Sequence, residues 1–148
     1  MNVNKYGSLS AYCCLALLFI AASCTNLQSL YSEEAYRQAV SLKVESIEML
    51  GNATDAFAMH ENEIRYLKTK LQKAYQYALG RPNNEISARQ WEILIDPDRN
   101  LLGGFIERWK QQGSISVTFI NENKGLISDS FDTIIQLESG KIKPSDLE

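Results

Sequence analysis

The stretch AFAMHENEIRYLKTKLQKAYQYAL, residues 56–79, decides the fold of this protein. Apolar or weakly polar positions recur in it at alternating steps of three and four residues, the spacing of a heptad-like seam on an α-helix. These positions are Phe57, His60, Ile64, Leu67, Leu71, Ala74 and Ala78. The charged residues fall on the outer face and are Glu61, Glu63, Arg65, Lys68, Lys70 and Lys73. The stretch predicts a long amphipathic helix whose seam, Leu67 and Leu71 included, is buried against other helices.

A second helix is predicted upstream, from about Leu30 to Gly51. Its apolar residues also recur at helical steps and are Tyr36, Val40, Val44, Ile47 and Leu50. Glu33 and Glu34 lie in its first turn, where carboxylates favour the positive end of the helix dipole. The stretch 56–79 ends at Gly80-Arg81-Pro82, with glycine at the C-cap. We expect the two helices to form an antiparallel hairpin.

Two shorter helices are predicted after a polar link over residues 80–86. Ser87, with Gln90 three residues later, matches a capping box that opens a helix reaching Ile95. Asp96-Pro97 then matches an N-cap followed by proline at the first helical position.

A glycine pair, Gly103-Gly104, lies in the second of these short helices, which extends to Gly113. Glycine inside a helix costs about 1 kcal/mol relative to alanine. The pair therefore indicates either a close approach of another segment or a helix that begins only at Phe105.

The last helix is predicted from about Ser116 to Leu137. The β-branched segment 115–120 leaves a short strand as an alternative, but no second convincing strand is available to pair with it. We therefore predict an all-α fold: a small antiparallel bundle of four to five helices over residues 30–140, with a flexible tail over residues 141–148.

The N-terminal stretch LALLFIAASC, residues 15–24, has the parts of a secretory signal. Lys5 precedes an apolar run from Ala11 to Ala22, and small residues follow. This run is about a dozen residues long, short of the ~20 that a membrane-spanning helix needs. The sequence predicts a signal peptide over residues 1–23, cleaved between Ser23 and Cys24.

The small residues Ala21-Ala22-Ser23 followed by Cys24 resemble the lipobox of bacterial lipoproteins, although that family prefers Leu, Val or Ile where Ala21 stands. The resemblance implies acylation of Cys24 by chains such as palmitate, and a tether over residues 24–29. Thr25 in place of Asp implies the outer membrane of a Gram-negative cell, with the domain on the periplasmic face. The alternative is a plain secretory signal that leaves Cys24 as an ordinary thiol.

Composition restricts the function of the mature chain. Without residues 1–23, of which only Lys5 is charged, 125 residues remain, with 14 basic and 18 acidic side chains and a formal net charge of −4. This balance argues against a nucleic-acid partner. The three cysteines all lie at or before Cys24, and His60 is the only histidine. We therefore expect no cofactor, no metal and no thiol nucleophile.

Candidate functional residues are few. His60 is either a pH switch or general base, or a half-buried helix residue near a bundle end. Arg81, Trp91, Arg99 and Trp109 are predicted partner-binding residues, because aromatic and arginine anchors dominate protein interfaces. In the alternative interpretation the tryptophans belong to the core and the polar residues nearby only form turns.

We predict a non-enzymatic function: a lipid-anchored periplasmic protein that contacts the membrane through Cys24 and binds another envelope protein. The first alternative is a small-molecule or peptide binder with a pocket near Trp91 and Trp109. A carboxylate-based hydrolase, using Asp96 and Asp98 with Glu107, or Glu61 with Glu63, is less favoured because nothing in the sequence fixes the distance between these groups.

Overall fold

The computed structural model describes residues 31–147, so the signal peptide, the cleavage site, Cys24 and the tether lie outside the described residues. The described part is all-helical and contains no strand, which confirms the predicted fold class. Its helices are α2 (Glu33–Gly51), α3 (Phe57–Leu79), α4 (Glu85–Ile95), α5 (Leu102–Gln112) and α6 (Val117–Glu138), with short 3₁₀ turns at Asn52–Thr54 and Pro144–Asp146. None of these helices combines the length and the apolar character that crossing a membrane requires.

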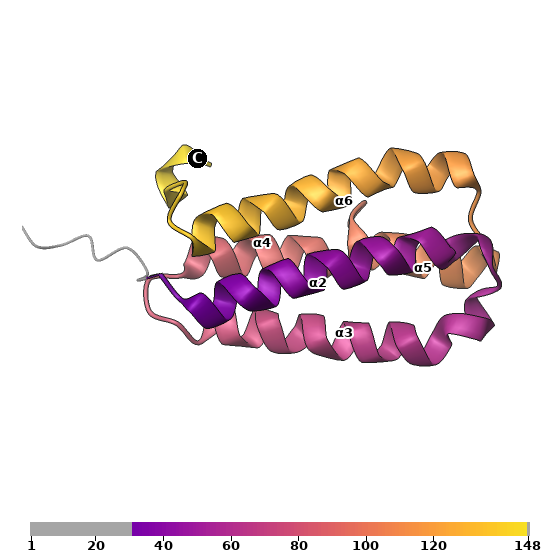
Figure 1. Ribbon diagram of the computed structural model, residues 1–148, viewed down its shortest axis with the longest axis horizontal. Helices are drawn as coiled ribbons and strands as arrows, with labels where there is room; N and C mark the ends of the chain where they lie inside the picture. Colours follow the sequence, from indigo (N-terminus) through magenta and orange to yellow (C-terminus); the bar gives the residue numbers. More distant parts are fainter. Residues whose placement is uncertain (1–30, 148) are drawn as a thin grey trace, which may run out of the picture.

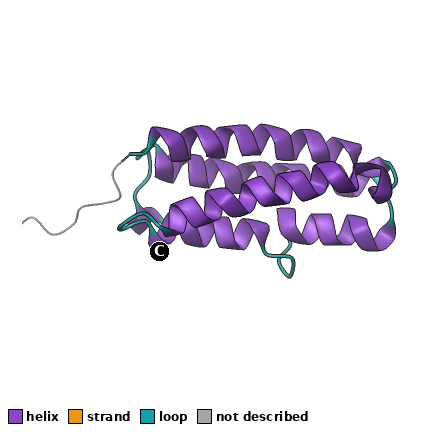
Figure 2. Ribbon diagram, turned by 90° about the horizontal axis from the view of Figure 1, so that it is seen from below, coloured by secondary structure: helices purple, strands orange, loops and turns teal. Residues whose placement is uncertain are grey.

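The helices form an up-down-up-down bundle (Figure 1). α4 and α5 follow each other along the same side of the bundle and together take the place of one long helix. The connection between them, residues 96–101, projects away from the bundle (Figure 2). The domain is therefore a four-helix bundle whose third helix is interrupted.

The seam of α3 is buried as predicted. Leu67 and Leu71 are 4% and 2% exposed, and the other buried residues of this helix are Ile64, Ala74 and Ala78. Phe57 packs on the edge of the core rather than inside it. The register of the deciding stretch is therefore correct.

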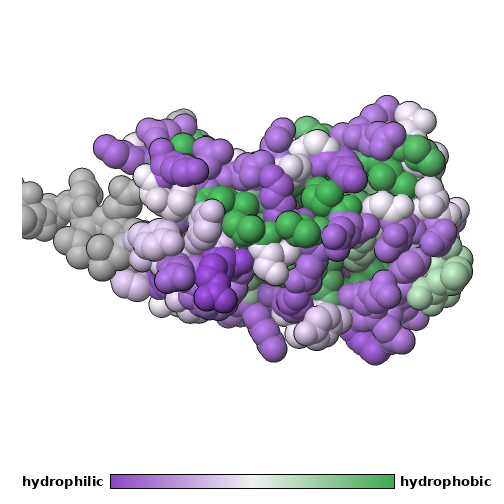
Figure 3. Space-filling view, in the orientation of Figure 1, coloured by the Kyte–Doolittle hydropathy of each residue, from purple (hydrophilic) through white to green (hydrophobic). Residues whose placement is uncertain are grey.

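The predicted face of α2 is only partly correct: Leu50 is fully buried and Ile47 packs against the core, but Tyr36 and Val40 are only partly buried. The residues buried on this helix are Ala35, Ala39, Leu42, Ser46, Met49 and Leu50. Val44, placed on the apolar face by its spacing, is 52% exposed. Apolar residues form a broken stripe along the line where α2 meets α6 (Figure 3). The buried face combines small residues, which let α2 approach its neighbours closely, with the larger Leu42, Met49 and Leu50.

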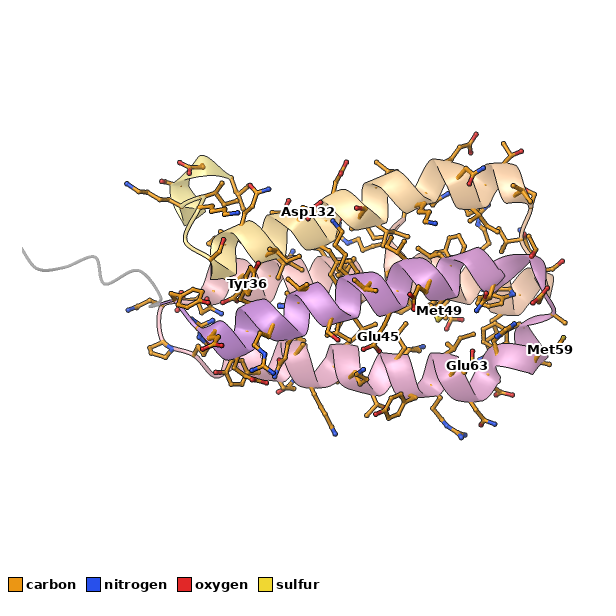
Figure 4. The ribbon with its side chains drawn as sticks, in the orientation of Figure 1. Tyr36, Glu45, Met49, Met59, Glu63 and Asp132 are labelled. Atoms are coloured by element: carbon orange, nitrogen blue, oxygen red, sulfur yellow. The ribbon has the colours of Figure 1, made fainter. Side chains whose placement is uncertain are left out.

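Ion pairs connect α2 to both helices beside it. Lys43 Nζ lies 2.6 Å from Asp132 Oδ2 on α6, and Lys70 of α3 pairs with Glu45. Figure 4 shows Glu45 and Asp132 on opposite sides of α2. These partly exposed pairs favour the observed order of the helices but contribute modestly to stability.

Two predicted helix starts are wrong. Asn84, not Ser87, is the N-cap of α4, and Ser87 is buried inside the helix. Asp96 ends α4 instead of opening α5, and its Oδ1 accepts a hydrogen bond from the Asp98 N–H at 2.9 Å. This turn satisfies the carboxylate locally, so the proline after it begins no helix.

The glycine pair of α5 has a steric role. α5 begins at Leu102, one residue before Gly103, so the pair lies within its first turn. A Cβ atom at Gly103 would clash with the carbonyl oxygen of Ile95, and one at Gly104 with that of Arg99. Glycine is therefore required where α5 passes beneath the connection from α4.

The strand alternative for residues 115–120 is excluded, because α6 begins at Val117. The Ser116 hydroxyl caps the helix by accepting a hydrogen bond from the Phe119 N–H at 3.3 Å. The predicted tail contains the second 3₁₀ turn, where the Lys143 N–H donates to Asp146 Oδ2 at 2.7 Å. Its flexibility stays a prediction.

Candidate functional site: a groove between α3 and α5

Both tryptophans are buried, which favours the alternative interpretation that they belong to the core. Trp91 is 2% exposed and packs edge-on against Phe131, with ring centres 5.9 Å apart. Trp109 is fully buried, and its indole N–H donates to the Asp55 carbonyl at 3.0 Å. Large aromatic rings with a satisfied N–H stabilise a core most when enclosed. Neither ring lines the groove or the smaller cavity described below.

Arg81 is engaged within the protein. Its guanidinium pairs with Glu138, whose side chain is 1% exposed. The same carboxylate accepts hydrogen bonds from Ser87 and, at 3.4 Å, from the Asn84 amide. We call Arg81, Asn84, Ser87 and Glu138 the Glu138 cluster. A buried carboxylate needs such partners, so Arg81 connects the α3–α4 link to the end of α6.

Arg99 is the one predicted partner-binding residue that lies on the surface. It belongs to the projecting connection between α4 and α5, and its side chain is 53% exposed. Its Nε lies 3.6 Å from Asp96 Oδ2, a loose pair between residues three apart. The four predicted partner-binding residues therefore do not form one site. The two tryptophans and Arg81 stabilise the fold, and only Arg99 is exposed.

A groove with a volume of about 570 Å³ lies between α3 and α5. This is within the range of ligand-binding clefts in proteins. Its lining residues on α3 are Phe57, Glu61, Ile64, Arg65, Lys68, Thr69, Gln72 and Lys73, and those on α5 are Ile106, Glu107 and Lys110. The α3 residues recur at helical spacing along one face, so the groove follows the helix from Phe57 to Lys73, about 24 Å at 1.5 Å per residue.

The floor of the groove is apolar. Ile64 and Ile106 are both 2% exposed and lie beneath it, and Phe57 lies at one end. The Phe57 N–H donates to the Gly113 carbonyl at 2.7 Å, which holds the start of α3 against the end of α5. A smaller cavity of about 80 Å³ lies next to the groove, where α4 gives way to α5. The floor is therefore apolar but largely enclosed, and the partly buried Phe57 is its most accessible apolar side chain.

The rim of the groove is positively charged, with four basic and two acidic side chains. Lys68 pairs loosely with Glu107 across the groove, at 3.7 Å. Among the residues that the structure describes, Arg65, Lys73 and Lys110 form no ion pair with an acidic side chain. These cations lie on an acidic protein and are available to an anionic ligand.

The spacing of Arg65, Lys68 and Lys73 predicts only a solvated outer face and gives no sign that they share a groove. They are exposed, as that assignment requires, but the position of α5 turns their side of α3 into one wall of a groove. The one sequence feature that could have indicated a groove is the break in the helical pattern after Ile95, because two short helices cover a neighbouring helix less completely than one long helix.

His60 lies at the end of the bundle near Trp109, with ring centres 5.6 Å apart. Its Nδ1 lies 3.1 Å from a Glu63 carboxylate oxygen, and its Nε2 lies 3.2 Å from one of Asp55. These hydrogen bonds, that to Glu63 above all, raise the pKa of His60 above its usual 6.5. The ring is half-buried at a bundle end, as one of the two interpretations predicted, and its charged form bridges two carboxylates.

Within residues 31–147, no cluster of three or more His, Cys, Asp or Glu side chains could hold a metal ion. No protein-family model, no curated protein and no solved structure matches this chain. The groove between α3 and α5 is accordingly the feature from which a function can be argued.

Proposed function

We propose that this protein is a non-enzymatic, lipid-anchored periplasmic protein that binds an acidic amphipathic segment of an envelope protein in the groove between α3 and α5. The observation that carries the proposal is the combination of an apolar floor with unpaired cations on the rim. An amphipathic helix buries its apolar face in such a groove, while its flanking carboxylates meet the cations.

The shape of the groove supports a helical segment more than a small molecule. Its wall on α3 is about 24 Å long, enough for roughly four turns of a bound helix. The smaller cavity beside it, about 80 Å³, is far below the size of a ligand pocket. The alternative of a small-molecule pocket at Trp91 and Trp109 is not favoured, since both rings are enclosed.

The carboxylates considered for hydrolysis have other surroundings. Asp96 belongs to the turn that ends α4, Asp98 is exposed, and Glu107 pairs with Lys68. Active-site carboxylates are typically gathered in a cleft that perturbs them. This arrangement supports a binding function over catalysis.

The anchor is proposed from the sequence alone, on the stretch that ends at Cys24. Replacing Cys24 with serine should abolish labelling of the protein by palmitate and leave an unprocessed or soluble product. Equal labelling of the wild type and Cys24→Ser would refute the anchor without affecting the groove.

The groove is tested with two synthetic helical peptides that share a leucine face and carry either glutamate or lysine on their flanks. The glutamate peptide should bind the full-length protein and the lysine peptide should not. The double substitution Lys73→Glu and Lys110→Glu should weaken binding of the glutamate peptide by about tenfold, because two attractions become repulsions.

The matched control is Lys124→Glu with Lys141→Glu, which changes the net charge equally on exposed residues that do not line the groove. Titration by fluorescence anisotropy gives each dissociation constant. Equal binding of the two peptides, or an equal loss in the control variant, would show that the groove does not select acidic segments.

A further inference from the structure

One end of the bundle gathers the tyrosines. The described residues contain five tyrosines, and four of them lie where α2 begins or α3 ends: Tyr31, Tyr36, Tyr75 and Tyr77. Figure 4 shows Tyr36 at this end and Met59 at the opposite end. We call this end the tyrosine end.

Two of these tyrosines, Tyr31 and Tyr77, are exposed, whereas Tyr36 and Tyr75 are partly buried. Tyr31 is 60% exposed and its ring centre lies 6.5 Å from that of Tyr36. Tyr77 is 40% exposed, and its hydroxyl lies 3.1 Å from the Ser32 hydroxyl, which connects the end of α3 to the start of α2. Leu79, 55% exposed, extends the apolar surface. Exposed rings with a polar tip suit a boundary between water and an apolar phase.

The short stretch between Cys24 and Tyr31 points to the lipid bilayer as the apolar phase. Tyr31 lies seven residues after Cys24. A fully extended chain spans at most ~3.6 Å per residue, so acyl chains on Cys24 would hold Tyr31 within about 25 Å of the bilayer surface. This step rests on the anchor proposed above.

Charge does not oppose contact with a bilayer. The tyrosine end and the C-terminal segment beside it (Figure 1) carry exposed charges of both signs: Glu33, Glu34, Arg37, Glu85, Lys141, Lys143 and Asp146. This near balance suits zwitterionic headgroups and lacks the basic cluster that selects anionic lipids.

We propose that the tyrosine end lies in the headgroup region of the membrane, with Tyr31 and Tyr77 as the interfacial anchors. Tyrosine is enriched at this depth in membrane proteins because its ring is amphipathic. The bundle then stands upright. The groove begins near Lys73, one helical turn from Tyr77, and ends at Phe57, farther from the bilayer, so a bound segment lies along the membrane normal.

The test uses two tryptophan reporters in the full-length, membrane-extracted protein: Tyr77→Trp at the tyrosine end and Met59→Trp at the far end. Met59 is the matched control because it is 74% exposed and apolar. Each variant is reconstituted in phosphatidylcholine vesicles with bromine near the headgroups, and fluorescence loss is measured after subtracting the wild-type signal of Trp91 and Trp109. We expect at least about twofold greater quenching for Tyr77→Trp. Tyr31→Trp serves as a second reporter if Tyr77→Trp lowers the melting temperature.

The outcomes separate this inference from the anchor. The orientation is judged on protein that has the mass of the acylated form and floats with the vesicles. In that protein, equal quenching of the two reporters, or stronger quenching of Met59→Trp, would overturn the proposed orientation. A protein that lacks the acyl mass and does not float would refute the anchor, and the orientation with it.

Discussion

The Glu138 cluster and the groove between α3 and α5 are built from similar side chains and do opposite things. In the cluster, Arg81 and Ser87 surround a carboxylate that water does not reach. Along the groove, Arg65, Lys73 and Lys110 face solvent above an apolar floor. The difference teaches that burial decides the role of a charge: an enclosed charge is committed to its partners, whereas an exposed one remains available.

The largest loss of stability is expected from a substitution inside the Glu138 cluster. Glu138→Ala should lower the free energy of unfolding by about 3–5 kcal/mol, because it leaves the Arg81 guanidinium without its buried partner. Glu122→Ala, on the exposed face of the same helix, should change it by less than about 0.5 kcal/mol. Urea denaturation measures both, and similar losses would mean that the cluster does not hold the end of α6.

Substitutions in and beside the groove should affect stability and peptide binding differently. Leu71, 2% exposed, lines the cavity beside the groove, and Leu71→Ala should cost about 2–5 kcal/mol through lost packing. Arg65→Ala on the rim should cost less than about 0.5 kcal/mol while weakening binding of the glutamate peptide. If both variants unfold at the same urea concentration, the register of α3 is wrong.

His60 combines features of both regions, since its charge is partly enclosed and depends on pH. A raised pKa means that protonated His60 stabilises the fold at pH values below the unfolded pKa, and that this contribution disappears as the pH rises through the folded value. The stability lost in His60→Gln should therefore be greater near about pH 5 than near about pH 8. Thermal unfolding at the two values measures this, and a difference independent of pH would exclude the charged bridge to Asp55 and Glu63.

The smallest effect on stability is expected at Arg99, outside both regions. Its exposed pair with Asp96 predicts a change of less than about 0.5 kcal/mol for Arg99→Ala. If the projecting turn contacts the partner, this variant should still reduce recovery of a crosslinked envelope protein. Lys124→Ala is the control, because Lys124 is exposed and does not line the groove. Equal recovery with both variants would limit the partner surface to the groove.

Sequence patterns were reliable where one physical signal dominated. In residues 56–79 the periodicity, charge distribution and terminal glycine agree, and α3 forms over Phe57–Leu79 with the predicted seam buried. In α2 two signals compete, because small residues occur at helical spacing beside larger apolar ones. Periodicity alone favoured the set that includes Val44, whereas helix packing buried a partly different set that includes Leu42 and Ser46.

The candidate site was the least predictable part. Ser87 and Asp96 have the local chemistry of helix caps, and only the folded chain shows that the first donates to Glu138, 51 residues away, and the second closes a turn. The tryptophans gave a real signal, since they lie on α4 and α5, the two short helices that replace one long helix of the bundle. That signal reflected the core, as the alternative interpretation predicted.

By itself the sequence determined that the described chain is helical, where its longest helices run, and that one face of α3 is buried, because these properties follow from repeating local chemistry along a single helix. The tertiary structure alone decided which charges are enclosed, that the third helix leaves a groove beside α3, and that four tyrosines meet at one end. Each of these depends on contacts between residues far apart in the chain, which the spacing within one helix does not encode.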